Sequence, residues 1–177
     1  MLPHGLHRRA LHHFLPRRPL KAHELAPLPP SAKVWSTELV TERKSSFVGH
    51  AVRVRSVDEA TLALQHILAD KRLSPLPSPP ISRRHNILAY RLTHLESPTL
   101  LSGSDCHGEP PAGKNLLALL EKLDVKDVLL VVTRWYGGVP MGGLRFQVIN
   151  QVGKQALDLG GFTPSGAEQA GRAGKKR

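Results

Sequence analysis

The pattern of apolar and polar residues predicts four strands and a candidate fifth. Residues 128–133 give the clearest strand signal, because five consecutive apolar residues lie between Asp127 and the residues that lead to a glycine turn. Such a run is typical of a strand that is covered on both faces. The other strands are expected over residues 34–40, 46–55 and 87–93, and residues 99–104 form either a short strand or an extended approach to the next element.

Three further segments space their apolar residues as a helix does. The first helix is expected to begin at Ser56, where Glu59 three residues later gives a capping-box pattern, and to end near Arg72. The proline-rich residues 75–80 follow and predict an exposed loop that continues through Arg84. The second and third helices are expected over residues 115–123 and 143–159.

The order of these elements predicts helices packed on a sheet, and therefore an α+β fold. The folded part is expected to be one domain over residues 34–162, long enough to bury a core of its own. Residues 1–33 and 163–177 are expected to be disordered basic extensions. Prolines interrupt the first of them, which is also rich in histidine and arginine, and no apolar period runs through the second.

The net charge of +11 first suggests a protein that binds nucleic acid. Most of this charge belongs to the two extensions. Residues 1–33 carry six basic and one acidic side chain, residues 163–177 carry four and one, and residues 34–162 carry 15 and 12. The predicted domain is almost balanced, so its composition alone does not indicate a nucleic-acid-binding fold.

Composition also bears on the compartment. The single cysteine, Cys106, cannot form a disulfide within the chain, and the longest apolar run is far shorter than the roughly 20 residues that span a bilayer. We therefore expect a soluble cytoplasmic protein that does not contact a membrane. Mitochondrial residence is the alternative, since the first 23 residues contain arginines and no acid, although prolines interrupt them and serine is absent.

Two glycine-rich segments carry the candidate chemistry. The first, residues 102–114, leads into the second helix and places Asp105, Cys106, His107 and Glu109 within five positions. A thiol beside an imidazole suggests a nucleophile with its base, but adjacent residues of an extended chain point in opposite directions. The spacing of Cys and His supplies no zinc site. The two acids ahead of a helix are explained more simply by its dipole, which favours them there.

The second segment, residues 133–146, runs from a strand through a glycine turn into the third helix, with Arg134 and Arg145 on either side. Free backbone amides at such a helix start favour an anion. The glycines match neither the Walker loop nor the dinucleotide fingerprint. The simpler interpretation is a tight turn that requires glycine, with Trp135 and Tyr136 packed at the strand end.

Together, the two segments resemble the IMPACT family over about residues 44–157. The likeness rests on the segments KSSFVGHA, GEPPAG, TRWYGG and GGLRFQVIN, which occur in this order. It implies a fold similar to the second domain of ribosomal protein S five, a four-stranded sheet with helices packed on one face. It also implies a binding surface drawn from both segments. The matching residues are Asp105, Glu109, Arg134, Trp135, Tyr136, Gly137, Gly138, Arg145 and Asn150.

The chain also departs from the family pattern. Leu144 stands where an aspartate is usual, Gln147 stands where a basic residue is common, and a further acid near Cys106 is missing. If the family surface works through an acidic cluster with Arg145, that function is weakened in this chain.

The resemblance implies a role in translation control. Eukaryotic members are similar to inhibitors of general amino acid control, which compete with the kinase that phosphorylates the initiation factor for its activator. A separate RWD domain makes the activator contact in those proteins. Residues 1–33 are too short and too rich in proline to form such a domain, so we expect this chain to lack one.

We therefore expect a non-enzymatic, translation-associated regulator with no catalytic residues, cofactor or metal. Its expected partner is a protein of the translation machinery or of the general-control kinase pathway, with ribosome or RNA contact through the basic extensions. The alternative is a small enzyme or an anion- and phosphate-binding module that uses the two glycine-rich turns.

Overall fold

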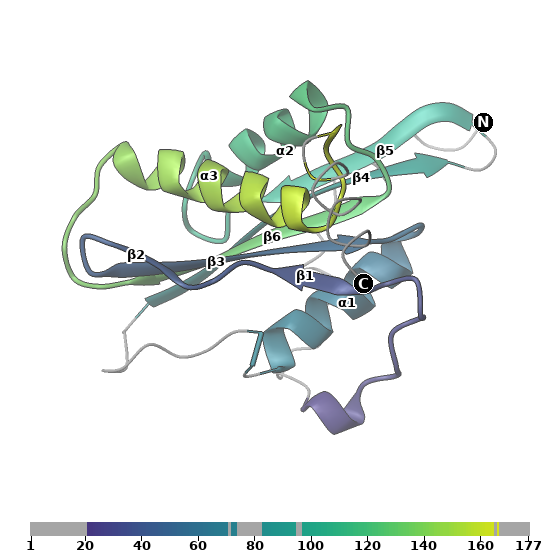
Figure 1. Cartoon of the computed structure of the whole chain (residues 1–177), viewed down its shortest axis with the longest axis horizontal. Helices are drawn as coiled ribbons and strands as arrows, with labels where there is room; N and C mark the ends of the chain where they lie inside the picture. Colours follow the sequence, from purple (N-terminus) through teal and green to yellow (C-terminus); the bar gives the residue numbers. More distant parts are fainter. Residues whose placement is uncertain (1–20, 71, 74–82, 95–96, 165, 167–177) are drawn as a thin grey trace, which may run out of the picture.

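An antiparallel sheet lies between helices on its two faces (Figure 1). The computed structural model describes residues 21–70, 72–73, 83–94, 97–164 and 166. Within these residues the strands are β1 (Val34–Ser36), β2 (Val40–Glu42), β3 (Ser45–Arg53), β4 (Arg83–His94), β5 (Ser97–Asp105) and β6 (Val128–Tyr136). The helices are α1 (Val57–Ala69), α2 (Ala112–Lys122), α3 (Leu144–Leu159) and a short 3-10 helix (Ala22–Glu24).

Strand β6 forms the centre of the sheet. The strand order is β1-β3-β6-β4-β5, and β2 pairs with β3 beside β1, so that β1 and β2 follow one another along the same edge. Strand β6 pairs with β3 on one side and β4 on the other, and an apolar core covers each of its faces, so its residues from Val128 to Trp135 are all buried. The prediction of a strand covered on both faces is therefore confirmed.

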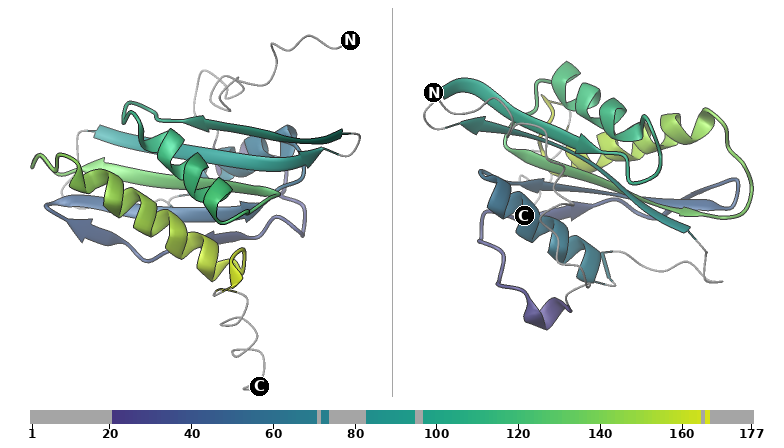
Figure 2. Two further views of the ribbon diagram at one scale, coloured as in Figure 1. Left: turned by 90° about the horizontal axis from the view of Figure 1, so that it is seen from above. Right: turned by 180° about the vertical axis from the view of Figure 1, so that it is seen from behind.

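The sheet carries an apolar core on each face. Seen from above, α2 and α3 lie next to each other across one face, and α1 lies on the other face (Figure 2). Alternation along β3 explains this arrangement, because Phe47 and Ala51 face α2 and α3 whereas Val52 and Val54 face α1. The α+β class is confirmed. The expected four strands and single helical face differ from the structure, which has six strands in the described residues and needs helical cover on both apolar faces.

Most predicted elements are present with shifted ends. Ser56 caps α1, and its Oγ accepts the amide hydrogen of Glu59, but the Glu59 carboxylate accepts from the Arg55 amide and not from Ser56. The expected strand over residues 34–40 is divided into β1 and β2. Strand β4 begins at Arg83. The prediction of a loop that continues through Arg84 is therefore wrong for Arg83 and Arg84.

The predicted proline-rich loop and most of the two predicted extensions lie outside the residues that the structure describes. The proline-rich residues 75–80, residues 1–20 and residues 167–177 lie outside the described residues. In the described part of the first extension, Ala32 is buried and Leu28 packs against the core on the α1 side. The limits of the predicted domain stay a prediction.

His50 is a buried histidine in the middle of β3. It is fully buried, and its Nδ1 lies 2.8 Å from the Ser36 hydroxyl oxygen. Burial, together with the smaller effect of the nearby positive charge of Arg84, lowers the pKa of His50 to about 4. The folded protein therefore holds this imidazole neutral at pH values where an exposed histidine is protonated.

We expect the free energy of unfolding to fall as the pH drops from about 6.5 to about 4. The unfolded chain binds a proton at His50 over this range and the folded chain does not, so a pKa lowered to about 4 corresponds to a loss of about 3 kcal/mol. Urea denaturation at pH 7.5 and pH 4.5 measures the difference. A His50→Gln variant should lose this part of the pH dependence, and an unchanged slope in that variant would contradict the assignment.

Candidate functional site

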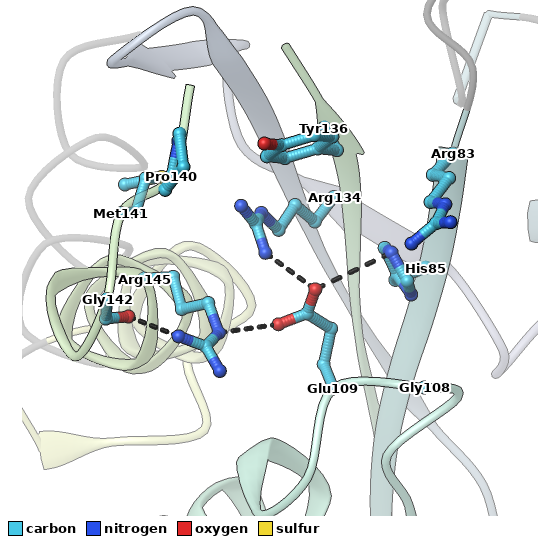
Figure 3. A pocket seen from close by; sticks show the side chains of 10 residues that line it. All are labelled: Arg83, His85, Gly108, Glu109, Arg134, Tyr136, Pro140, Met141, Gly142 and Arg145. Carbon is cyan, nitrogen blue, oxygen red and sulfur yellow. Dashed lines mark hydrogen bonds and ion pairs between the residues drawn. The ribbon is translucent and has the colours of Figure 1, made fainter. Parts of the chain in front are cut away.

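A cavity of about 390 Å³ opens at one end of the sheet, on the face covered by α2 and α3 (Figure 3). It lies where β6 ends and β4 begins, beside the segments that lead into the two helices. Its lining is mainly charged or aromatic. The described lining residues are Arg83, His85, Gly108, Glu109, Arg134, Tyr136, Pro140, Met141, Gly142 and Arg145.

Strand register brings the cationic side chains together. Arg134 of β6 is paired with Phe47 of β3 and with His85 of β4, and Tyr136 is paired with Arg83. Directly paired residues on neighbouring strands point to the same face of a sheet. The pairing of β4 with β6 therefore places Arg83, which was expected in a loop, and His85 beside residues of the TRWYGG segment.

Glu109 is the centre of the ion-pair network in this cavity. One of its carboxylate oxygens accepts a hydrogen bond from Arg134 at 2.6 Å and lies 3.5 Å from Nε2 of His85. The other oxygen accepts from Nε of Arg145 at 2.8 Å. Arg145 also donates to the carbonyl oxygen of Gly142 at the start of α3. One carboxylate thus holds arginines from β6 and α3 in place.

Arg134 is buried despite its permanent charge, with only 3% of the residue exposed. Its guanidinium group lies 5.4 Å from the centre of the Tyr136 ring and 5.8 Å from that of Phe47, both within reach of a cation–π interaction. It also donates to the hydroxyl oxygen of Ser45 at 3.3 Å. Its Nε is buried without a hydrogen-bond partner.

The turn before α2 sets the position of Glu109. The Glu109 amide donates to the carbonyl oxygen of Cys106 at 2.9 Å, and Gly108 has a positive φ of 85°. His85 is tied to the same turn, because its Nδ1 lies 2.8 Å from the carbonyl oxygen of His107. Burial lowers the pKa of His107, although the Asp105 carboxylate opposes this shift. The turn therefore positions the acid and one of its neighbours together.

Four of the nine sequence-predicted site residues line the cavity: Glu109, Arg134, Tyr136 and Arg145. The other five do not line it. Trp135 points to the opposite face of the sheet, where Arg84 lies 5.8 Å from its ring centre. The Asp105 carboxylate accepts the His107 amide hydrogen at 2.6 Å. Gly137 and Gly138 form the turn after β6, and Asn150 lies in α3 with its buried Oδ1 unpartnered.

Sequence reasoning missed Arg83 and His85 as lining residues. Prolines just before them favoured a loop, although Arg83, His85, Ile87 and Ala89 alternate along the chain as residues of one strand face do. That alternation was the available signal. Ser45 was also missed, because it lies just before the strand expected to begin at residue 46 and the sequence gives no sign of its contact with Arg134.

The described residues provide neither a metal-binding cluster nor a membrane-spanning helix. No group of three or more His, Cys, Asp or Glu side chains is arranged to hold a metal ion in this part of the chain. None of the helices formed by the described residues has the length and apolar character needed to cross a membrane.

Comparison with known proteins identifies the domain. The Impact N-terminal domain matches residues 43–157. Protein IMPACT of Rattus norvegicus is 36% identical over 89% of this chain and 45% of its own length, and that of Homo sapiens is 34% identical over 78% and 41%. The chain thus spans less than half the length of the curated relatives it matches.

Two solved structures are also similar. A crystal structure described as a hypothetical protein has a TM-score of 0.55 and 26% identity, covering 70% of this chain and 60% of its own. The structure of the two-domain translational regulator Yih1 has a TM-score of 0.47 and 30% identity, covering 74% and 48%. The family match over residues 43–157 includes the GEPPAG, TRWYGG and GGLRFQVIN segments. The chain belongs to the IMPACT family, as the resemblance of these segments predicts.

Proposed function

We propose that this chain is a non-enzymatic regulator of translation that acts by binding the ribosome or a translation factor. The observation that carries the proposal is the match of residues 43–157 to the Impact N-terminal domain. Resemblance to that family implies translation control, and general amino acid control is the pathway in which we place the chain. A protein of the general-control kinase pathway is its proposed regulatory partner.

The geometry around Glu109 supports binding over catalysis. Both of its carboxylate oxygens already accept hydrogen bonds from guanidinium groups, at 2.6 Å from Arg134 and 2.8 Å from Arg145. A general base needs an oxygen within hydrogen-bond reach of the substrate proton that it removes. A carboxylate engaged at both oxygens is better suited to keeping two arginines in a fixed position.

The distribution of charge supports a partner that carries phosphate groups. Four basic residues lie in residues 163–177 and six in residues 1–33, against one acid in each. Cationic side chains that neutralise phosphates release counterions, so such binding weakens as salt rises. The basic ends are therefore proposed to strengthen contact with an RNA-bearing partner, while the folded domain supplies the specific surface.

Co-sedimentation of the full chain with ribosomes over a salt series tests this function. We expect the chain in the ribosomal fraction at low salt and progressively less of it as salt rises. A K175Q/K176Q/R177Q variant should show a weaker salt dependence, because three cationic side chains are removed. Absence of the full chain from the ribosomal fraction at low salt would overturn the proposal.

The cytoplasm is the proposed compartment, because translation factors and ribosomes act there. The arginine-containing, acid-free start of the chain gives mitochondrial import as the alternative. A fluorescent protein fused to residues 1–33 distinguishes the two. A diffuse signal agrees with the cytoplasm, and import of the fusion would favour the alternative.

A further inference from the structure

We infer that the cavity at the end of β6 binds the phosphate monoester of a nucleotide. The nucleotide is either free or forms the 5′ end of an RNA strand, since both present the same phosphate group and base. This inference is independent of the translation role, because it rests on the lining of the cavity alone.

The charge of the cavity fits a doubly charged anion. The described lining residues include three guanidinium groups and one carboxylate, which leaves a surplus of two positive charges without counting His85. A phosphate monoester carries about −1.5 to −2 charges at neutral pH. Arginine suits such a ligand especially well, because its planar guanidinium group can donate two parallel hydrogen bonds to phosphate oxygens.

Two arginines of the lining have donor groups that no described residue satisfies, an exposed one on Arg83 and a buried one on Arg134. The Arg83 side chain is exposed and makes no hydrogen bond or ion pair in the part of the chain that the structure describes. Arg134 is 3% exposed, lines the cavity and has a buried Nε without a partner. A buried donor that lacks a partner calls for a specific explanation. A ligand in this cavity that approaches Arg134 provides one.

Backbone dipoles add to the positive potential. Helix α3 starts at Leu144 beside the lining residues Gly142 and Arg145, and α2 starts three residues after Glu109 (Figure 3). Neither N-terminus is capped by a side chain. The N-terminal end of a helix carries a partial positive charge and favours phosphate groups. Two helix starts and three arginines therefore act on the same cavity.

The size of the cavity indicates more than a bare phosphate ion. Its volume of about 390 Å³ falls within the range of small-molecule sites, roughly 300–1,000 Å³. The Tyr136 ring lies on one wall, and Pro140 and Met141 add apolar surface to the lining (Figure 3). Nucleic-acid bases stack on aromatic rings of this kind. A nucleotide uses both parts, with its phosphate on the arginines and its base against Tyr136.

Isothermal titration calorimetry on the full chain tests the inference with adenosine 5′-monophosphate as the probe. We expect binding of this nucleotide and at least tenfold weaker binding of adenosine, which lacks the phosphate. Arg83→Gln and Arg145→Gln should each weaken nucleotide binding at least tenfold, because each removes a charged donor. Arg55→Gln is the matched control, since Arg55 is exposed and lies outside the cavity lining, and it should leave binding unchanged within twofold.

A six-nucleotide RNA, with and without a 5′ phosphate, separates the two sources of the nucleotide. Binding of the phosphorylated RNA at least tenfold tighter than both the free nucleotide and the unphosphorylated RNA assigns the site to an RNA end. A free nucleotide that binds at least as tightly as the phosphorylated RNA assigns it to a free ligand. Circular dichroism of each variant establishes that it is folded.

Three outcomes would overturn the inference. The first is the absence of binding by both the nucleotide and the phosphorylated RNA at millimolar concentrations. The second is equal affinity for adenosine and adenosine 5′-monophosphate, which would show that the phosphate is not recognised. The third is an equal affinity for the nucleotide in all three variants. Folded Arg83→Gln and Arg145→Gln proteins would then bind it as tightly as the Arg55→Gln control.

Discussion

Glu109→Gln is expected to lower the free energy of unfolding by about 3 kcal/mol, the cost typical of removing one partner from a buried ion pair. Glu109 is 8% exposed and Arg134 is 3% exposed, so neither side chain can turn to water in the folded state. A glutamine has the same shape as glutamate but no charge. Its NH₂ group would face the N–H groups of an arginine, and two donors cannot form a hydrogen bond with each other. Urea denaturation followed by circular dichroism measures the loss.

Two matched variants make the Glu109 prediction specific. Glu42→Gln removes the same charge from an exposed residue of β2 and should change stability by less than about 0.5 kcal/mol. Arg145→Gln should cost about 1 kcal/mol, because the Arg145 side chain is 29% exposed and Glu109 keeps its contact with Arg134. Equal effects of Glu109→Gln and Glu42→Gln would show that this ion pair contributes nothing net to folding.

The fold class could be read from the sequence because each long element has a clear period. The run at residues 128–133 predicts a strand buried on both faces, and β6 is such a strand. The same signal, combined with the alternation in β3, already implies cover on both faces of the sheet. The expectation of helices on one face came from family resemblance, and the placement of α1 corrects it.

The ends of elements were harder to predict because contacts distant in sequence set them. Pairing with β6 extends β4 back to Arg83, against the local effect of the preceding prolines. Pairing with β3 divides the expected first strand into β1 and β2. Such register depends on which strands become neighbours, and no local pattern of the chain specifies that.

The sequence predicted four of the residues that line the cavity, one from the first glycine-rich segment and three from the second. A strand alternates its faces, so Arg134 and Tyr136 enter the cavity while Trp135 between them faces away. Family resemblance names all three without this distinction. The contacts of Arg83 and His85 arise from sheet pairing and become visible only in three dimensions.

The turn after β6 gives the second large expected effect. Gly137→Ala is expected to destabilise the protein by at least about 3 kcal/mol, or to prevent folding, because a β-carbon there would lie 1.7 Å from the carbonyl oxygen of Lys44. That oxygen belongs to the backbone of the turn between β2 and β3. Pairing of Ser46 with Trp135 holds β3 and β6 together next to this turn. Neither backbone can move away without loss of strand pairing.

Gly143→Ala is the control for this steric effect, since it is the same substitution near the start of α3. A β-carbon at Gly143 meets nothing within 4 Å, and its φ of −66° suits alanine. We expect an unchanged or slightly raised stability, because alanine lowers the entropy of the unfolded chain. Chemical denaturation of both variants and of the unmodified protein gives the comparison. A Gly137→Ala variant within about 1 kcal/mol of Gly143→Ala would show that the contact with Lys44 relaxes easily, and the turn would then not require glycine at this position.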